Sequence, residues 1–148
     1  MKDGIETFTI NLPVNFKNPS RYNLGLTYLE DVPFVPGKTT FELKGFVRPD
    51  RGPMTIGEMR VRVKHLKGLA GHDHTEFLFT KRERLPKSWK RGRLPNLLFP
   101  GSVVENLEHL RLMPGLLWFD NNWISRFFTL NDSFDQESHI VICTREDT

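Results

Sequence analysis

The chain has 148 residues, of which 38% are hydrophobic and 26% are charged, and its formal net charge is +3. This length suits one domain, and the apolar content suffices for a core, so a wholly disordered chain is excluded. No apolar run approaches the ~18 residues that span a bilayer, and residues 1–6 do not resemble a signal peptide. We therefore expect a single domain over residues 1–148 that is cytoplasmic and has no membrane partner.

Apolar residues alternate with polar ones in the first third of the chain. This pattern predicts strands at residues 5–12, 22–28 and 39–47. Proline and glycine then cluster at residues 49–53, which predicts a turn.

The next segment carries two conflicting signals. Residues 55–58 (Thr-Ile-Gly-Glu) match a capping box, which favours the start of a helix. Met59, Val61 and Val63 alternate strictly with basic residues, which favours a strand. We predict a strand over residues 59–64, and a further strand over residues 75–80.

Residues 81–101 contain three prolines and two glycines and predict a long basic loop. A second capping box, Ser102 to Glu105, precedes apolar residues at helical spacing and predicts one clear helix over about 102–113. Residues 116–130 read as a hairpin that turns at residues 120–122, and residues 138–144 as a last strand. The expected class is therefore α+β and β-rich, with a curled antiparallel sheet or small barrel of about seven or eight short strands.

Positive charge is concentrated in the middle of the chain. Residues 1–59 hold 7 basic and 7 acidic side chains, residues 60–93 hold 11 basic and 3 acidic, and residues 94–148 hold 3 basic and 8 acidic. Seven of these cations fall within Lys81–Arg93, which we call the basic segment. A local positive field attracts polyanions, because Lys and Arg bind phosphate oxygens.

The basic segment predicts a non-enzymatic binding protein that contacts RNA or DNA, or a complex that contains nucleic acid. We expect no cofactor. Trp89 offers a ring that could stack on a base or pack inside the protein. The predicted strand at residues 59–64 would extend the positive surface. The candidate binding residues are Lys81, Arg82, Arg84, Lys87, Trp89, Lys90, Arg91, Arg93, Arg60, Arg62 and Lys64.

Other interpretations of the basic segment remain open. It could dock on an acidic protein surface, as a regulator or inhibitor would. It could also be a solvated turn, or be neutralised by acidic residues of the last third of the same chain. The available acidic residues are Glu105, Glu108, Asp132, Asp135 and Glu137.

The histidines suggest weaker candidates. His72 and His74 would share one face of a strand, as paired metal ligands do, although an exposed turn is the simpler interpretation. His109 and His139 could serve a metal-independent ribonuclease, the second alternative function, as general acid and base. The single cysteine, Cys143, lies in an apolar run and reads as a core residue.

Overall fold

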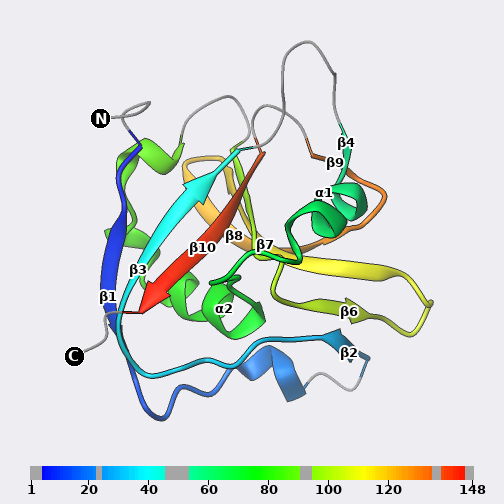
Figure 1. Ribbon diagram of the computed structural model, residues 1–148, viewed down its shortest axis with the longest axis horizontal. Helices are drawn as coiled ribbons and strands as arrows, with labels where there is room; N and C mark the ends of the chain where they lie inside the picture. The colour runs from blue at the N-terminus through cyan, green and yellow to red at the C-terminus, as the bar shows by residue number, and fades with distance from the viewer. Residues whose placement is uncertain (1–4, 23–24, 46–53, 91–94, 135–137, 146–148) are drawn as a thin grey trace.

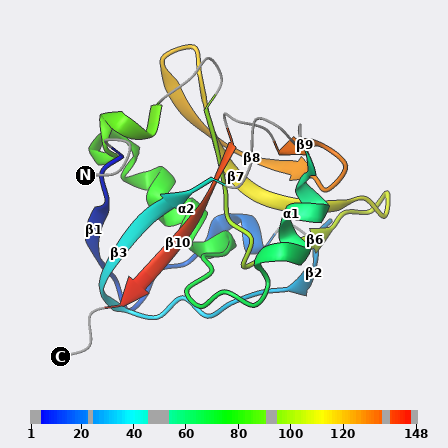
Figure 2. The same ribbon diagram turned by 45° about the horizontal axis from the view of Figure 1, so that its top comes forward.

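The computed structural model describes residues 5–22, 25–45, 54–90, 95–134 and 138–145. Its main sheet has eight strands in the order β1-β3-β10-β5-β7-β6-β2, with β8 paired to β7. Figures 1 and 2 show that the sheet curls and that α2 lies within the curve. The strands of this sheet are β1 (Phe8–Leu12), β2 (Thr27–Glu30), β3 (Gly37–Lys44), β5 (Asn96–Leu98), β6 (Val103–Glu105), β7 (Arg111–Phe119), β8 (Asn122–Thr129) and β10 (Ser138–Arg145).

Shorter elements complete the described chain. A two-stranded sheet lies beside α1, and three short 3-10 helices join the larger elements. Within the described residues, β5 and β10 pair in parallel and the other pairings are antiparallel. The remaining elements are β4 (Met54–Thr55), β9 (Ser133–Phe134), α1 (Ile56–Val63), α2 (His72–Thr80), η1 (Pro19–Tyr22), η2 (Arg82–Arg84) and η3 (Lys87–Lys90).

The β-rich α+β class is confirmed, and so are several predicted strands. The strands predicted at residues 5–12, 39–47 and 138–144 are β1, β3 and β10. The predicted hairpin is β7–β8, and its turn residues Asp120 and Asn121 have φ angles of 53° and 61°. Positive φ at both central residues is what a two-residue type I′ turn requires.

Other predictions need adjustment. The strand predicted at residues 22–28 is displaced toward the C-terminus, because β2 begins only at Thr27. The predicted long loop at residues 81–101 contains two 3-10 helices and the strand β5. The predicted turn at residues 49–53 lies outside the described residues.

The strand predicted at residues 59–64 is wrong, because this segment belongs to α1. The competing capping box forms: the backbone N–H of Glu58 donates to Thr55 Oγ1, and the N–H of Thr55 donates to Glu58 Oε1, both at 3.0 Å. The alternation of apolar and basic residues gave the wrong prediction because Val61, one of its apolar positions, is 64% exposed. The residues that α1 buries follow helical spacing instead: Ile56, Met59 and Val63.

The strand predicted at residues 75–80 is also wrong, because these residues form most of α2. The hydroxyl of Thr75 donates to the carbonyl of Gly71 at 3.0 Å, one helical turn back. Phe77 and Leu78 are adjacent and both buried, which an interior helix allows because the sheet surrounds it on more than one side.

The helix predicted at 102–113 is wrong as well, since β6, a turn and the start of β7 occupy these residues. Leu107 and Leu110, whose spacing suggested a helix, are exposed in the turn. The side chain of Asn106 accepts two backbone N–H groups of the turn at 3.0 Å each. His109 takes a positive φ of 65° there, which ends any helical path.

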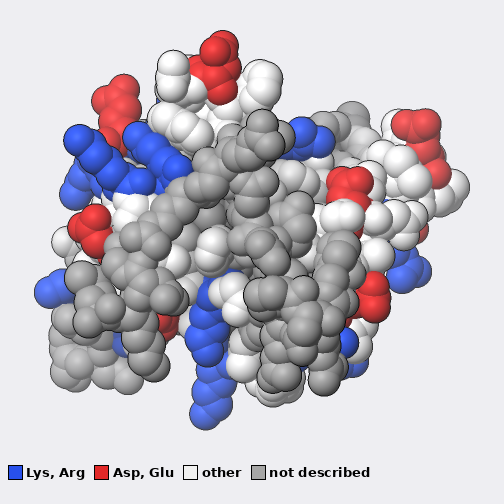
Figure 3. All heavy atoms as spheres, turned by 90° about the horizontal axis from the view of Figure 1, so that it is seen from above, with Lys and Arg blue, Asp and Glu red and all other residues white. Residues whose placement is uncertain are grey.

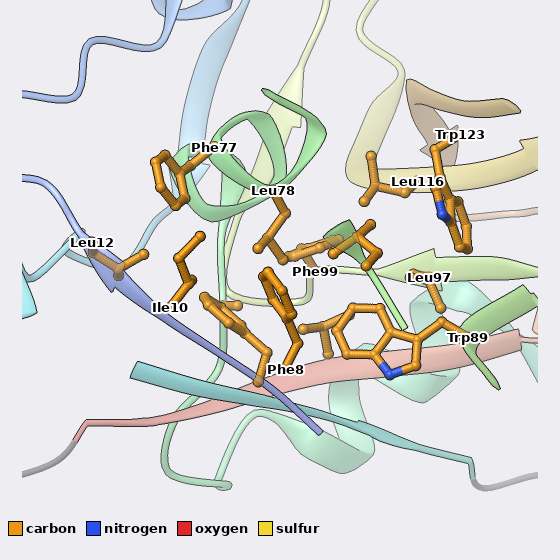
Figure 4. Close-up of a cluster of buried hydrophobic side chains, with 14 residues drawn as sticks. Phe8, Ile10, Leu12, Phe77, Leu78, Trp89, Leu97, Phe99, Leu116 and Trp123 are labelled. Carbon is orange, nitrogen blue, oxygen red and sulfur yellow. The ribbon is translucent and has the colours of Figure 1, made fainter. Parts of the chain in front are cut away.

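Two apolar clusters lie on opposite faces of the sheet. On β5, Leu97 joins the first cluster and Leu98 the second, because successive strand residues point to opposite faces. The first cluster holds residues of β1, α2 and the basic segment (Figure 4), and the second holds the buried face of α1. The sheet therefore separates α1 from the basic segment. Among the described residues, no helix is long and apolar enough to cross a bilayer.

Candidate nucleic-acid interface

The basic segment begins where α2 ends and is anchored by two buried side chains, Leu85 and Trp89. Trp89 is 1% exposed, its ring meets Phe8 edge-on at 6.2 Å, and Figure 4 shows it between Phe8 and Leu97. Its Nε1–H donates to the carbonyl oxygen of Glu6 at 2.7 Å. Trp89 therefore packs inside the protein, which is the second of the two roles that the sequence suggested for it.

Five cations of the basic segment lie in the described residues, whereas Arg91 and Arg93 lie outside them. Arg84 and Lys87 are exposed, and Lys81, Arg82 and Lys90 are half-buried. Figure 3 shows one group of Lys and Arg side chains with acidic side chains next to it, and further Lys and Arg side chains elsewhere on the same face. Four of the five sit over aromatic rings: Lys81 at 5.9 Å from Phe77, Arg82 at 4.4 Å from Phe79, Arg84 at 5.9 Å from Phe8 and Lys90 at 4.1 Å from Trp118.

These ring contacts hold the cations without neutralising them. A ring face attracts a cation and covers its apolar stem, but the positive charge still acts on its surroundings. Among the described residues, no carboxylate lies within ion-pairing distance of any of the five cations. The described part of the segment thus presents positive charge that no described carboxylate pairs with, on a scaffold that its buried side chains hold.

Two described acidic residues of the last third interact elsewhere. Glu105 lies 3.8 Å from Nδ1 of the exposed His109, and the Asp132 carboxylate accepts the backbone N–H of Thr129 at 3.1 Å. Asp135 and Glu137 lie outside the described residues. Internal neutralisation of the basic segment therefore has no support from the described acidic residues.

A pocket of about 430 Å³ adjoins the basic segment. Three cations line it, and they come from β3, from the end of α2 and from η2. The described residues around it are Thr9, Ile10, Asn11, Pro13, Lys38, Phe77, Lys81 and Arg84.

The three cations predicted at residues 60–64 do not extend this surface. Arg60 and Arg62 belong to α1 and Lys64 is its C-cap, and α1 packs on the opposite face of the sheet from the basic segment. Arg60 pairs with Glu30 on β2, and Arg62 and Lys64 are exposed. The helix, rather than the predicted strand, places them there.

His72 and His74 do not share the strand face that was predicted for them. Both lie on α2, where residues two apart point to different sides of the helix. The His72 ring contacts Phe127, whereas the His74 ring contacts Phe34, with centroids 4.9 Å and 5.2 Å apart. Burial lowers the pKa of each imidazole to about 4.

The two histidines proposed for catalysis lie on separate elements. His109 occupies the exposed turn between β6 and β7, where its side chain is 86% exposed. His139 lies within β10, which pairs with β3 and β5.

A partly buried polar cluster joins segments that are distant in the sequence. The Ser102 hydroxyl donates to Asp31 at 2.6 Å and accepts the backbone N–H of His72 at 2.7 Å. Arg21 donates to Asp73 at 2.7 Å and also pairs with Asp31. This network attaches β2 and its flanking segments to the start of α2. No local motif signals it, because its members come from four separate stretches of chain.

A second part of the polar cluster surrounds the His72 ring. The Tyr28 hydroxyl lies 2.5 Å from His72 Nδ1, and Nε2 lies 4.0 Å from Glu76, which accepts a hydrogen bond from Ser125. Burial raises the pKa of Tyr28 to about 12, and it also raises that of Glu76. The pKa values of Tyr28 and His72 thus both lie far from 7, so neither side chain is tuned for proton transfer at neutral pH. The geometry fits a structural role.

Comparison with known proteins adds no relative. No protein-family model matches the chain, and no similar protein is found among curated proteins or solved structures.

Proposed function

We propose that this protein binds nucleic acid through the basic segment. The observation that carries the proposal is the set of five described cations that have no carboxylate partner among the described residues. Buried Leu85 and Trp89 hold the turns that display them. A cation that is already positioned loses less conformational entropy when it binds a phosphate. We place this function in the cytoplasm.

The structure supports contacts with the phosphate backbone more than contacts with bases. Trp89 is buried, so the basic segment has no described aromatic ring open for stacking. Contacts from Lys and Arg to phosphates position a protein on nucleic acid without reading its sequence. We therefore expect weak sequence preference and strong dependence on salt.

Charge reversal tests the proposal. Lys87→Glu combined with Lys90→Glu should weaken binding to a random oligonucleotide by about tenfold or more at low salt, because each change replaces attraction to phosphate by repulsion. Fluorescence anisotropy with labelled single-stranded and double-stranded RNA and DNA measures the affinity. Thermal unfolding of the variant shows whether its fold is kept.

The matched control lies on the other side of the sheet. Arg62→Glu with Lys64→Glu changes the net charge by the same amount on α1, where both side chains are exposed. We expect this variant to bind nearly as well as the unaltered protein. Equal losses in the two variants would show that net charge, rather than the basic segment, controls binding.

Two further experiments test the two alternative functions. A folded protein that binds no oligonucleotide, yet recovers one stoichiometric acidic protein from nuclease-treated lysate, would favour a regulator that docks on an acidic surface. Cleavage of RNA that is lost in His109→Ala or His139→Ala would favour the ribonuclease.

A further inference from the structure

A second pocket lies at the end of the main sheet where β1 and β10 finish and β3 begins. Its volume is about 320 Å³, which is near the lower end of the ~300–1,000 Å³ that ligand pockets usually have. Figures 1 and 2 show that the chain between β2 and β3 reaches this end of the sheet beside the C-terminal end of β10. The pocket thus lies where strand ends meet connecting segments.

The walls of this pocket are mainly aliphatic. The turn between α1 and α2 forms one side and approaches β10 closely, because the carbonyl of Gly68 accepts the backbone N–H of Cys143 at 2.7 Å. Gly68 has a φ of 80°, and a side chain there would meet the Cys143 carbonyl oxygen, so only glycine fits. The apolar residues of the wall are Leu12, Val32, Pro33, Val35 and Leu69.

Arg145 supplies positive charge to this apolar space. It lies two residues after Cys143 on β10, so both side chains point to the face of the sheet that carries the first apolar cluster. None of the described lining residues is acidic. Among the described residues, no carboxylate lies within ion-pairing distance of Arg145. Its guanidinium is therefore available to an anion that enters the pocket.

His74 supplies a neutral hydrogen-bond donor. Its Nδ1 accepts the backbone N–H of Gly71 at 3.0 Å, so the proton of the neutral ring is on Nε2. Burial lowers the pKa of the ring to about 4, which keeps it neutral at pH 7. No described residue accepts a hydrogen bond from Nε2. His74 thus lines the pocket with a donor whose tautomer the start of α2 fixes.

This combination favours one class of ligand. A carboxylate carries one negative charge and matches the planar fork of one arginine with two parallel hydrogen bonds. A phosphate monoester carries about −1.5 to −2 at pH 7, which a single cation does not balance. Aliphatic walls suit a hydrocarbon body, because they remove its surface from water.

We propose that the second pocket binds a small aliphatic monocarboxylate. The carboxylate accepts hydrogen bonds from Arg145 and from Nε2 of His74, and the hydrocarbon chain lies against the aliphatic walls. This inference does not depend on the proposed function, because the basic segment lines no part of the second pocket in the described residues.

Calorimetric titration with three ligands of equal chain length tests the class of ligand. Octanoate should bind about tenfold tighter than octanol, because charge-assisted hydrogen bonds are added, and octylamine should bind more weakly than either. Arg145→Gln should reduce the affinity for octanoate to that for octanol and leave octanol unchanged. His74→Phe keeps a ring but removes the donor, so it should weaken octanoate more than octanol.

Two controls show that the effect belongs to this pocket. Lys44→Gln removes the same charge from the far end of β3, where Lys44 is exposed, and should leave octanoate binding unchanged. Cys143 lines the pocket and is the single cysteine of the chain, so its rate of labelling by a maleimide reports occupancy. Octanoate should slow this labelling several-fold. Thermal unfolding confirms that each variant is folded.

Several outcomes would overturn the inference. They are the absence of octanoate binding, equal binding of octanoate and octanol, and equal losses in Arg145→Gln and Lys44→Gln. Octanoate binding that leaves the labelling of Cys143 unchanged would also overturn it, since the ligand would then lie elsewhere. All these measurements are made without oligonucleotide, so each result leaves the test of nucleic-acid binding separate.

Discussion

At the residue scale, Trp89 determines how the basic segment is presented. Its indole fills space in the first apolar cluster, while its Nε1–H satisfies the carbonyl of Glu6 near the N-terminal end of the described chain. A backbone carbonyl left without a partner in such a place costs stability, so the hydrogen bond and the apolar contacts act together. Trp89, together with buried Leu85, anchors the segment whose charged side chains lie at the surface.

Removing the Trp89 ring should destabilise the protein strongly. We expect Trp89→Ala to lower the free energy of unfolding by about 3–5 kcal/mol, because it leaves a large cavity and an unpaired carbonyl. Chemical denaturation measures the change. Lys87→Ala, at an exposed position on the same turn, is the control and should change stability little. A loss below about 1 kcal/mol in Trp89→Ala would contradict the buried position.

The buried histidines should make the protein sensitive to acid. Unfolded histidine has a pKa near 6.5, whereas burial lowers the pKa of His72 and of His74 to about 4 in the folded protein. Between these pH values the unfolded state binds more protons, so the free energy of unfolding falls as the pH is lowered. We expect this loss between about pH 6.5 and pH 4, roughly 2 kcal/mol for each ring.

Urea denaturation at several pH values tests this expectation. His74→Phe places an apolar ring beside Phe34 and Phe41. It also removes one of the two imidazoles that take up a proton when the protein unfolds at low pH. We expect a shallower fall in its stability with decreasing pH, although its stability at pH 7 is lower because Gly71 loses an acceptor for its N–H. A slope unchanged from that of the unaltered protein would show that His74 does not contribute.

At the element scale, both helices occupy segments whose patterns favoured strands. In α1 the capping box and the helical spacing of Met59 and Val63 outweigh the alternation that Val61 completes. The predicted helix at 102–113 fails for the converse reason, since its capping box occupies a strand and Leu107 and Leu110 are exposed. The same local signal, a capping box, thus lies at the start of a helix in one segment and in a strand in the other. Contact with the sheet decided between the two outcomes.

The capping box of α1 should contribute measurable stability. Thr55→Ala removes the side-chain acceptor of the Glu58 N–H and should cost about 1 kcal/mol. Thermal or chemical denaturation measures the loss. Thr27→Ala, at an exposed position of β2, serves as the control. Equal effects at the two positions would show that the cap contributes nothing specific.

At the scale of the whole molecule, the sheet divides the surface. The basic segment lies on the side of the first apolar cluster, and α1 with its own cations lies on the side of the second. A nucleic-acid strand that follows the basic segment therefore does not also meet α1. This division limits the number of phosphates that the described protein can contact at once.

The salt dependence of binding should reflect that limit. If the five described cations of the basic segment all meet phosphates, the slope of log affinity against log salt should be about −4.5 on duplex DNA and about −3.5 on single strands. Affinities measured by anisotropy from about 50 to about 300 mM salt give the slope. A flat response would contradict phosphate binding, and Arg62→Ala should leave the slope unchanged.

The sequence alone determined the β-rich class, the strands β1, β3 and β10, the β7–β8 hairpin and the position of the basic segment. Each of these follows from a local pattern: alternation, a turn signal or a run of charge. Only the tertiary structure decided that Trp89 is buried, that the cations of α1 lie on the other side of the sheet, and that Lys38 meets Lys81 and Arg84 in one pocket. These facts depend on contacts between segments distant in the chain, and no local pattern encodes such contacts because side-chain burial is settled by what packs against each element.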